Sequence, residues 1–353
     1  MTDKRILFPR HTNIRDTYTI DSLLGEGAFG SVYKVRHKYL GIQAIKIFHQ
    51  GSIPKDQEPE LFNEAYVLSK LTHTNVVRVY EANTFSFNDQ RYCYIGMEYV
   101  KGGTLAGFIE QAVRFPIDKA ISIQKDICSG LAELHGKEPP LIHRDVKPQN
   151  IMISADNEFI AKISDFGLAK HVDPLTRLTE AAGTLAYLPP EGFWDYETPA
   201  SDVFSAGMIF YITLTGVPPF KMPSGYHSTK KSEIRSAVIA SRNKKPLPPS
   251  KYNLELDDEI DAIVLKALAP DIKNRYKDAI EFLKAIEGYQ YKKFMLPEEN
   301  IRKALELGKQ YSNLKQAAEL LENAIKQYPK EKQHELKQKY KAILSNWKKG
   351  VAM

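Results

Sequence analysis

Residues 143–150 read His-Arg-Asp-Val-Lys-Pro-Gln-Asn, and Asp165-Phe166-Gly167 follows fifteen residues after Asn150. Asp145 is able to accept a proton from an incoming hydroxyl group, and Asn150 and Asp165 offer the hard oxygen ligands that Mg²⁺ prefers. Lys147 carries a positive charge that neutralises a phosphoryl group during its transfer. The spacing of these side chains therefore predicts a metal–triphosphate site, with Asp145 and Lys147 as catalytic groups.

This stretch resembles the catalytic loop of the protein kinase family, and the lysine two residues after Asp145 is similar to that of its serine/threonine branch. The resemblance covers about residues 18–288. It implies an α+β, bilobal protein kinase fold, with a small β-rich N-terminal lobe and a large helical C-terminal lobe. It also implies ATP and Mg²⁺, with Mn²⁺ as an alternative ion, and transfer of the γ-phosphoryl group to serine or threonine hydroxyls of proteins.

Residues 25–32 read Gly-Glu-Gly-Ala-Phe-Gly-Ser-Val, a glycine-rich pattern that dinucleotide-binding folds share in part. The following residues separate the two, because they continue as an alternating β-branched strand where a dinucleotide fold needs a helix. Glycine lets backbone amides approach phosphates closely. The segment therefore predicts a hairpin that covers the phosphates, with the nucleotide against four residues, Gly25, Gly27, Gly30 and Val32.

Lys46 lies in the apolar strand expected over residues 43–47. A lone lysine in a strand is ordinarily exposed to solvent, but the resemblance implies that Lys46 contacts the α and β phosphates and is fixed by a carboxylate. Glu64 is the predicted carboxylate, because it lies beside an apolar helical stripe. Glu58 and Glu60 are the rivals, although acids near Pro59, at the expected helix start, are also explained by the helix dipole.

The resemblance further implies an adenine pocket. Met97 is expected behind the base, the backbone of residues 98–100 is expected to hydrogen-bond it, and Met152 is expected beneath it. The remaining nucleotide-binding residues are therefore Ala44, Met97, Glu98, Val100 and Met152.

Arg144 stands directly before Asp145 and carries a positive charge that needs an anion. A phosphothreonine supplies about −1.5 to −2 charges, and kinases often order a loop in this way. Thr176 and Thr179 are the candidate sites of autophosphorylation, and ordinary loop polarity is the other interpretation.

Four further positions have structural roles that the resemblance implies. Glu191 and Arg275 are expected to form a buried ion pair, because either charge alone would be costly to bury. Asp202 is expected to anchor the backbone of the catalytic loop, and Thr184 to hydrogen-bond Asp145 and Lys147.

The C-terminal residues differ in composition from the rest. The chain of 353 residues has a net charge of +6, and the part from Tyr291 onward is its basic region. Apolar stripes within residues 301–311, 317–328 and 336–347 predict three helices. Leu307-Gly308, Tyr311, Ala317, Leu321, Ala324 and Pro329 resemble a tetratricopeptide repeat with a shortened turn.

One such repeat cannot bury its apolar face alone. We therefore expect a small all-α appendage that docks on the kinase domain, self-associates or binds a partner. The basic charge favours a solvated helix surface over nucleic-acid or lipid binding. The predicted organisation is a flexible N-terminus at 1–15, a kinase domain at 16–290, a linker at 291–299 and the helical tail at 300–353.

The chain contains two cysteines, which provide no disulfide framework, and its most apolar window, residues 203–217, is shorter than a bilayer requires. With no evident signal peptide, we expect a cytoplasmic protein. Two alternatives remain: an ATP-binding signalling scaffold whose tail recruits partners, and a small-molecule kinase. A scaffold has no chemical need for Lys46, Asp145 and Asp165 together, and the long segment 168–191 favours a protein substrate because it offers a peptide platform.

Overall fold

The computed structural model describes residues 8–27, 30–155, 159–165, 186–193, 196–221, 231–328 and 330–351. The chain divides into two compact units, residues 1–283 and 284–353. Throughout these described ranges, every helix is too short or too polar to cross a bilayer.

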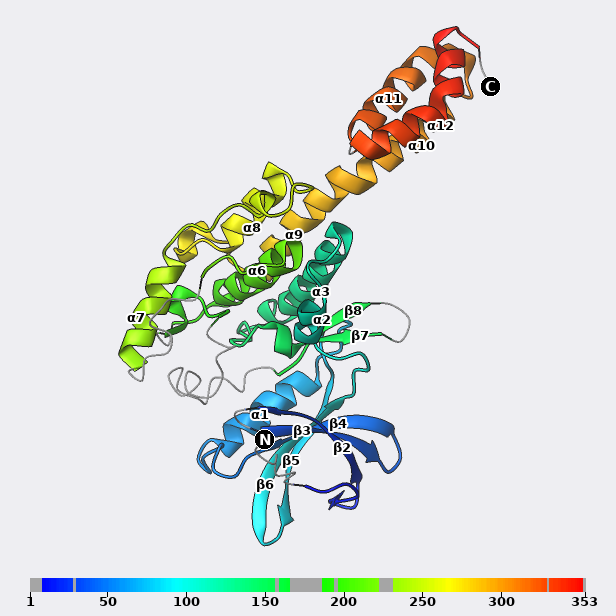
Figure 1. Ribbon diagram of the computed structural model, residues 1–353. Coiled ribbons are helices and arrows are strands. Elements are labelled where there is room, and N and C mark those ends of the chain that lie inside the picture. Colours follow the sequence, from blue (N-terminus) through cyan, green and yellow to red (C-terminus); the bar gives the residue numbers. More distant parts are fainter. Residues whose placement is uncertain are drawn as a thin grey trace. The chain divides into compact units, whose positions relative to one another are not determined.

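The first part of the larger unit is a β-sheet with one helix beside it, as the sequence predicted (Figure 1). The strands are antiparallel and follow the order β1-β2-β3-β4-β6-β5. In β4, Ile45 and Ile47 enter an apolar cluster on one face, so the alternate residues Ala44 and Lys46 face the other side. The elements are β1 (Asn13–Ile14), β2 (Tyr18–Gly27), β3 (Gly30–His37), β4 (Gly41–Phe48), α1 (Glu58–Ser69), β5 (Val79–Phe87) and β6 (Gln90–Glu98).

The rest of this unit is mostly helical and surrounds α6 (Figure 1). Almost every residue of α6 is buried, as expected for a helix that is apolar on all sides. Thr198 and Ser201 form a capping box at its start. The elements are α2 (Leu105–Gln111), α3 (Ile117–His135), β7 (Ile151–Ser154), β8 (Ile160–Ile163), α6 (Pro199–Thr215), α7 (Lys231–Arg242), α8 (Asp258–Ala267) and the first residues of α9 (Ala279–Gln290).

The N-terminal residues correct one expectation. Residues 1–15 were expected to be flexible, yet residues 13 and 14 pair with β2, and Phe8 is only 1% exposed. The Phe8 ring lies 5.0 to 5.9 Å from four aromatic rings of the sheet, those of Tyr33, Phe85, Phe87 and Tyr92. Large buried aromatic side chains contribute strongly to a core, which explains why residues 8–14 pack against the sheet.

Replacing Phe8 by alanine is expected to destabilise the larger unit by about 3–5 kcal/mol, because the change removes a buried ring and leaves a cavity. Urea denaturation of the full chain, followed by circular dichroism, measures this loss. Tyr39→Ala serves as the control, since Tyr39 is 80% exposed and its loss should cost within about 0.5 kcal/mol. Equal stability of Phe8→Ala and Tyr39→Ala would contradict the packing described.

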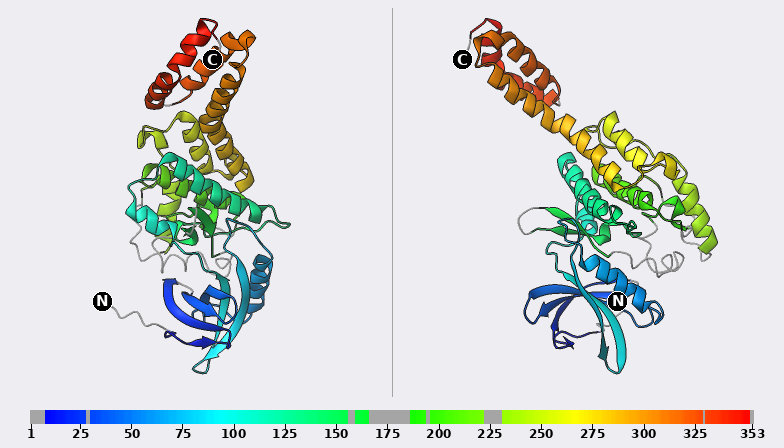
Figure 2. Two further views of the ribbon diagram at one scale, coloured as in Figure 1. Left: turned by 90° about the vertical axis from the view of Figure 1, so that its right-hand side faces the viewer. Right: turned by 180° about the vertical axis from the view of Figure 1, so that it is seen from behind.

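The smaller unit contains the three helices that the apolar stripes predicted, seen side by side in orange to red (Figure 2). Its core includes Leu321 and Ala317 from the second helix and Trp347 from the third. Gly308 lies so close to Trp347 that an added Cβ would be 2.0 Å from the ring. The elements are α10 (Leu296–Leu307), α11 (Leu314–Lys326) and α12 (Lys330–Lys348).

The third helix buries the apolar face that a single repeat-like hairpin would leave exposed, because residues of α12 lie in the same core cluster as those of α10 and α11. The segment 291–299, expected as a linker, is helical: a π-helical turn over Tyr291–Met295 leads directly into α10.

Candidate active site

The loop after α3 brings together three of the predicted side chains. The Nζ atom of Lys147 lies 2.8 Å from Asp145 Oδ2. Asn150 Nδ2 donates to the same oxygen and to the Asp145 carbonyl, both at 2.9 Å. Within the described part of the chain, both side-chain contacts of Asp145 thus use Oδ2, which leaves Oδ1 to accept a proton from a substrate. The same bonds orient the Asn150 amide and leave its oxygen for a metal.

Asp202, in α6, holds the backbone of this loop in the way the sequence predicted. Its carboxylate accepts the N–H groups of His143 at 2.7 Å and of Arg144 at 2.9 Å. Arg144 has a φ of 66°, a left-handed conformation that non-glycine residues adopt only when their surroundings impose it. The two hydrogen bonds to Asp202 therefore fix an unfavourable backbone conformation directly before Asp145.

Asp202 also receives a hydrogen bond from a histidine that sequence reasoning missed. His135 Nδ1 accepts the N–H of Ala279 at 3.1 Å, so the proton must be on Nε2, which donates to Asp202 Oδ2 at 3.0 Å. Burial raises the pKa of Asp202, but the bond from His135 and the N–H of His143 outweigh burial and hold this pKa below its usual value.

Lys46 and Asp165 meet between the sheet and the helical part. Lys46 Nζ lies 2.8 Å from Asp165 Oδ1, and Lys46 is only 8% exposed. Burial raises the pKa of Asp165, but the charge of Lys46, followed by that of Lys147, outweighs burial, and the net effect is a lowered pKa. Asp165 therefore lies within reach of cations from both parts of the unit and is held ionised.

The structure pairs Lys46 with a different carboxylate from the one predicted. Glu64 was the predicted carboxylate, but among the described residues the ion pair of Lys46 is with Asp165. Glu64 instead lines a cavity of about 570 Å³ together with His143 and Arg144. The face of α1 that carries Glu64 is therefore turned toward the loop after α3. Glu58, another candidate partner for Lys46, instead forms an ion pair with Arg91 at 2.8 Å.

The glycine-rich segment forms the predicted hairpin, with Gly25 opposite Val32 and Gly27 opposite Gly30. A Cβ at Gly30 would lie 2.4 Å from the Ile47 carbonyl, whereas a Cβ at Gly25 would meet nothing within 4 Å. Gly30 is therefore required by the close approach of β3 and β4, and the space beside Gly25 is open to a ligand.

Of the predicted adenine-contacting residues, Ala44, Met97, Glu98 and Met152 lie on β4, β6 and β7, and Val100 follows the end of β6. Ala44 is paired with Met97 across the sheet, and Met152 forms a bridge with Thr104. The Glu98 carboxylate accepts from Lys162 Nζ at 2.7 Å, and the Glu98 N–H donates to the Arg78 carbonyl at 2.8 Å. Protein groups thus use both the side chain and the N–H of Glu98, so its carbonyl and the backbone of Val100 are the groups left for a base.

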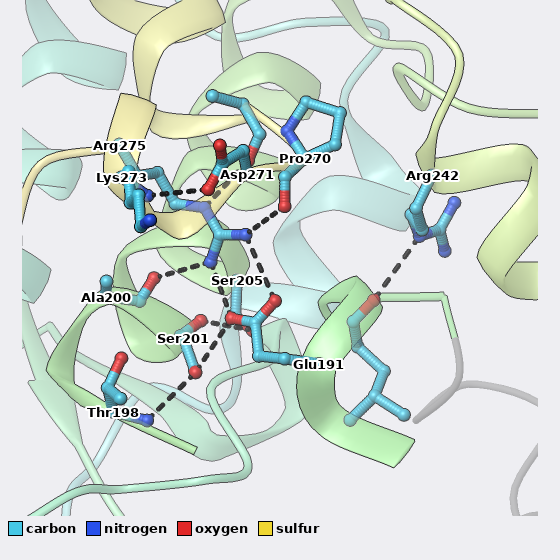
Figure 3. Close-up of polar contacts among 12 residues, drawn as sticks. Glu191, Thr198, Ala200, Ser201, Ser205, Arg242, Pro270, Asp271, Lys273 and Arg275 are labelled. Atoms are coloured by element: carbon cyan, nitrogen blue, oxygen red, sulfur yellow. Dashed lines mark hydrogen bonds and ion pairs between the residues drawn. The ribbon is translucent and has the colours of Figure 1, made fainter. Parts of the chain in front are cut away.

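The ion pair expected between Glu191 and Arg275 is present and bidentate, with N–O distances of 2.6 and 3.1 Å (Figure 3). Glu191 is 9% exposed and Arg275 is 4% exposed. Ser201 Oγ donates to Glu191 at 2.8 Å, and the guanidinium also donates to three backbone carbonyls, those of Ala200, Ala269 and Pro270. Buried charges are tolerated when they are paired and hydrogen-bonded in this way.

Arg144 has an anion that the sequence did not reveal. Its Nε lies 3.1 Å from Glu197 Oε2, and the two side chains are 23% and 13% exposed. The predicted phosphorylation sites Thr176 and Thr179, and Thr184 with its predicted hydrogen bonds, lie outside the described residues.

Comparison with known proteins shows which family the chain matches. The family model of the protein kinase domain matches residues 18–286. The chain is 34% identical over 281 residues to the serine/threonine-protein kinase PknB of Mycobacterium leprae, an alignment that covers 76% of this chain and 42% of that protein. It is 35% identical over 240 residues to the Aurora kinase of Schizosaccharomyces pombe, covering 67% of this chain and 64% of the other.

A solved structure has the same fold. The PknI kinase domain of Mycobacterium tuberculosis superimposes with a TM-score of 0.60 at 21% sequence identity, covering 80% of this chain and 99% of that domain. In the sequence alignment, the chain spans about two fifths of the length of the PknB protein of Mycobacterium leprae.

Proposed function

The chain belongs to the protein kinase family, and we propose that it transfers the γ-phosphoryl group of ATP to serine or threonine hydroxyls of proteins. One observation carries the proposal: Lys46, from the sheet, pairs with Asp165, and Lys147, from the loop after α3, pairs with Asp145, each at 2.8 Å. A triphosphate needs cations on several sides, and this arrangement provides them next to a base, Asp145.

The side chains have distinct tasks in this reaction. Asp145 accepts the proton of the substrate hydroxyl through Oδ1, and Lys147 neutralises charge on the transferred group. Lys46 holds the non-transferred phosphates. Asn150 and Asp165 present amide and carboxylate oxygens, a donor set that suits Mg²⁺, which would screen the triphosphate charge when bound. A nucleotide that takes Lys46 would release Asp165 from its ion pair, and Glu64 then becomes the carboxylate for Lys46 through a movement of α1.

Regulation and location belong to the same proposal. Autophosphorylation of Thr176 or Thr179 would supply a second anion for Arg144, in competition with Glu197. The helical tail would bind partners or a second copy of itself. Cys93 and Cys128 are buried free thiols, which favours a reducing compartment such as the cytoplasm.

Incubation of the full chain with labelled ATP and dephosphorylated casein should transfer label to the chain and to casein when Mg²⁺ is present. Chelation of the metal should abolish transfer, because the triphosphate charge is then unscreened. Phosphoamino-acid analysis should give phosphoserine and phosphothreonine, and mass spectrometry reports whether Thr176 or Thr179 is modified. Binding of ATP without any transfer would support the scaffold instead.

A further inference from the structure

Three successive backbone carbonyls are held by side chains at the start of the described segment 186–193. Arg242 donates from Nη2 to the carbonyl of Ala186 at 2.7 Å and from Nε to that of Leu188 at 3.3 Å; Figure 3 shows Arg242 with the second of these bonds as a dashed line. Ser205 Oγ donates to the intervening carbonyl of Tyr187 at 2.9 Å. The carbonyls of all three residues 186–188 are thus hydrogen-bonded to a side chain of α7 or α6. Ala186 and Tyr187 are nevertheless partly exposed.

Arg242 is unusual for an arginine. It is 1% exposed, and its guanidinium lies 4.8 Å from the centre of the Phe220 ring. Burial lowers the pKa of Arg242 to about 10, which still leaves it charged at neutral pH. Burying a charge is costly, so its hydrogen bonds to the two carbonyls, together with the contact with Phe220, offset that cost.

The held segment has a fixed position relative to the catalytic base because α6 holds both. Asp202 fixes the backbone before Asp145, and one turn later Ser205 fixes Tyr187. A hydroxyl can be presented to Asp145 only by a substrate that is itself held in a fixed place. Segment 186–188 lies near the end of residues 168–191, which were predicted to offer a peptide platform, and its partly exposed edge provides such a place.

We infer that Arg242 is a positioning residue for the protein substrate: from inside the molecule it fixes segment 186–188, against which an extended polypeptide docks beside Asp145. This inference rests on the proposed function. An arginine suits the task because its planar fork reaches two carbonyls at once, whereas the single ammonium of lysine follows no such fixed geometry.

Hydrogen–deuterium exchange of the full chain tests the anchoring without any catalysis. Peptides that contain residues 186–190 should exchange at least about tenfold faster in Arg242→Met than in wild type, since a lost anchor permits local opening. Arg114→Met is the matched control, because Arg114 is an exposed arginine of the same unit that pairs with Glu255. Unchanged exchange in Arg242→Met would overturn the inference, whatever the enzyme's activity.

Steady-state kinetics with casein and ATP test the consequence. Arg242→Met should raise the KM for casein about tenfold and leave the KM for ATP within about twofold, because only substrate docking is affected. Arg242→Lys should lie between the two proteins. Ser205→Ala gives a second test that keeps the buried charge, and a rise in the same KM is expected.

Two kinetic results would overturn the inference: equal changes in both KM values, or a lowered melting temperature with an unchanged KM for casein. Absence of transfer by wild type would instead count against the proposed function, and the exchange experiment would still decide the anchoring.

Discussion

Replacing Asp145 by asparagine is expected to reduce kcat for phosphoryl transfer by about 10³-fold, within the range of about 10²–10⁴ for the loss of a general base. An amide oxygen does not take up a proton at neutral pH, and the amide that replaces Oδ2 would face the Lys147 ammonium, which lies 2.8 Å away in the native protein. Initial rates with labelled ATP and casein measure the effect, and equilibrium binding of ATP should change little.

Asp258→Asn is the control for this variant, because Asp258 is an exposed acid in the first turn of α8. Full activity in Asp145→Asn would remove Asp145 from the reaction. Loss of both binding and transfer would show instead that Asp145 acts on the nucleotide site as a whole.

The second large effect concerns stability. Arg275→Met should destabilise the larger unit by about 3–5 kcal/mol, because it leaves the Glu191 carboxylate buried and without its cation. The same change also removes the donors to three backbone carbonyls. Urea denaturation of the full chain, compared with wild type, gives the difference in the free energy of unfolding.

Arg114→Met is the matched comparison, since its ion pair with Glu255 is largely exposed and such pairs contribute about 0–1 kcal/mol. The double variant Glu191→Gln with Arg275→Met should recover part of the loss, because an amide is cheaper to bury than a lone carboxylate. Equal losses in Arg275→Met and Arg114→Met would mean that the buried pair contributes no more than a surface pair.

The sequence predicted the glycine-rich hairpin, the strand of Lys46, the helix of Glu64 and the local part of the site because each of these depends on short spacings. Asp145, Lys147 and Asn150 are five residues apart or less, so one loop conformation brings them together. Lys46 is a lone lysine in a strand, and only the resemblance to a family indicated that it is not exposed to solvent. The ion pair of Glu191 with Arg275 spans 84 residues, and only the resemblance to a family indicated it.

The wrong or missing predictions share a cause, which is the packing of distant segments. Periodicity shows which residues of α1 are apolar, but the direction of Glu64 depends on how the helix lies against the loop after α3. Phe8 fills a space that residues 33–92 create. Two residues that the sequence analysis missed each carried one weak signal. Glu197 is an acid close to the start of a helix, and Arg242 is an arginine on an otherwise apolar helix face.

The hydrogen bond from Ala279 to His135 has a practical consequence for shortened versions of the protein. Because the first residue of α9 sets which ring nitrogen of His135 bears the proton, a truncation placed before Ala279 would leave that imidazole free to present a lone pair to Asp202. Two acceptors would then face each other behind the catalytic loop. A minimal catalytic fragment must therefore extend beyond residue 279, even though the last residue of the proposed reaction site, Asp165, lies more than a hundred positions earlier.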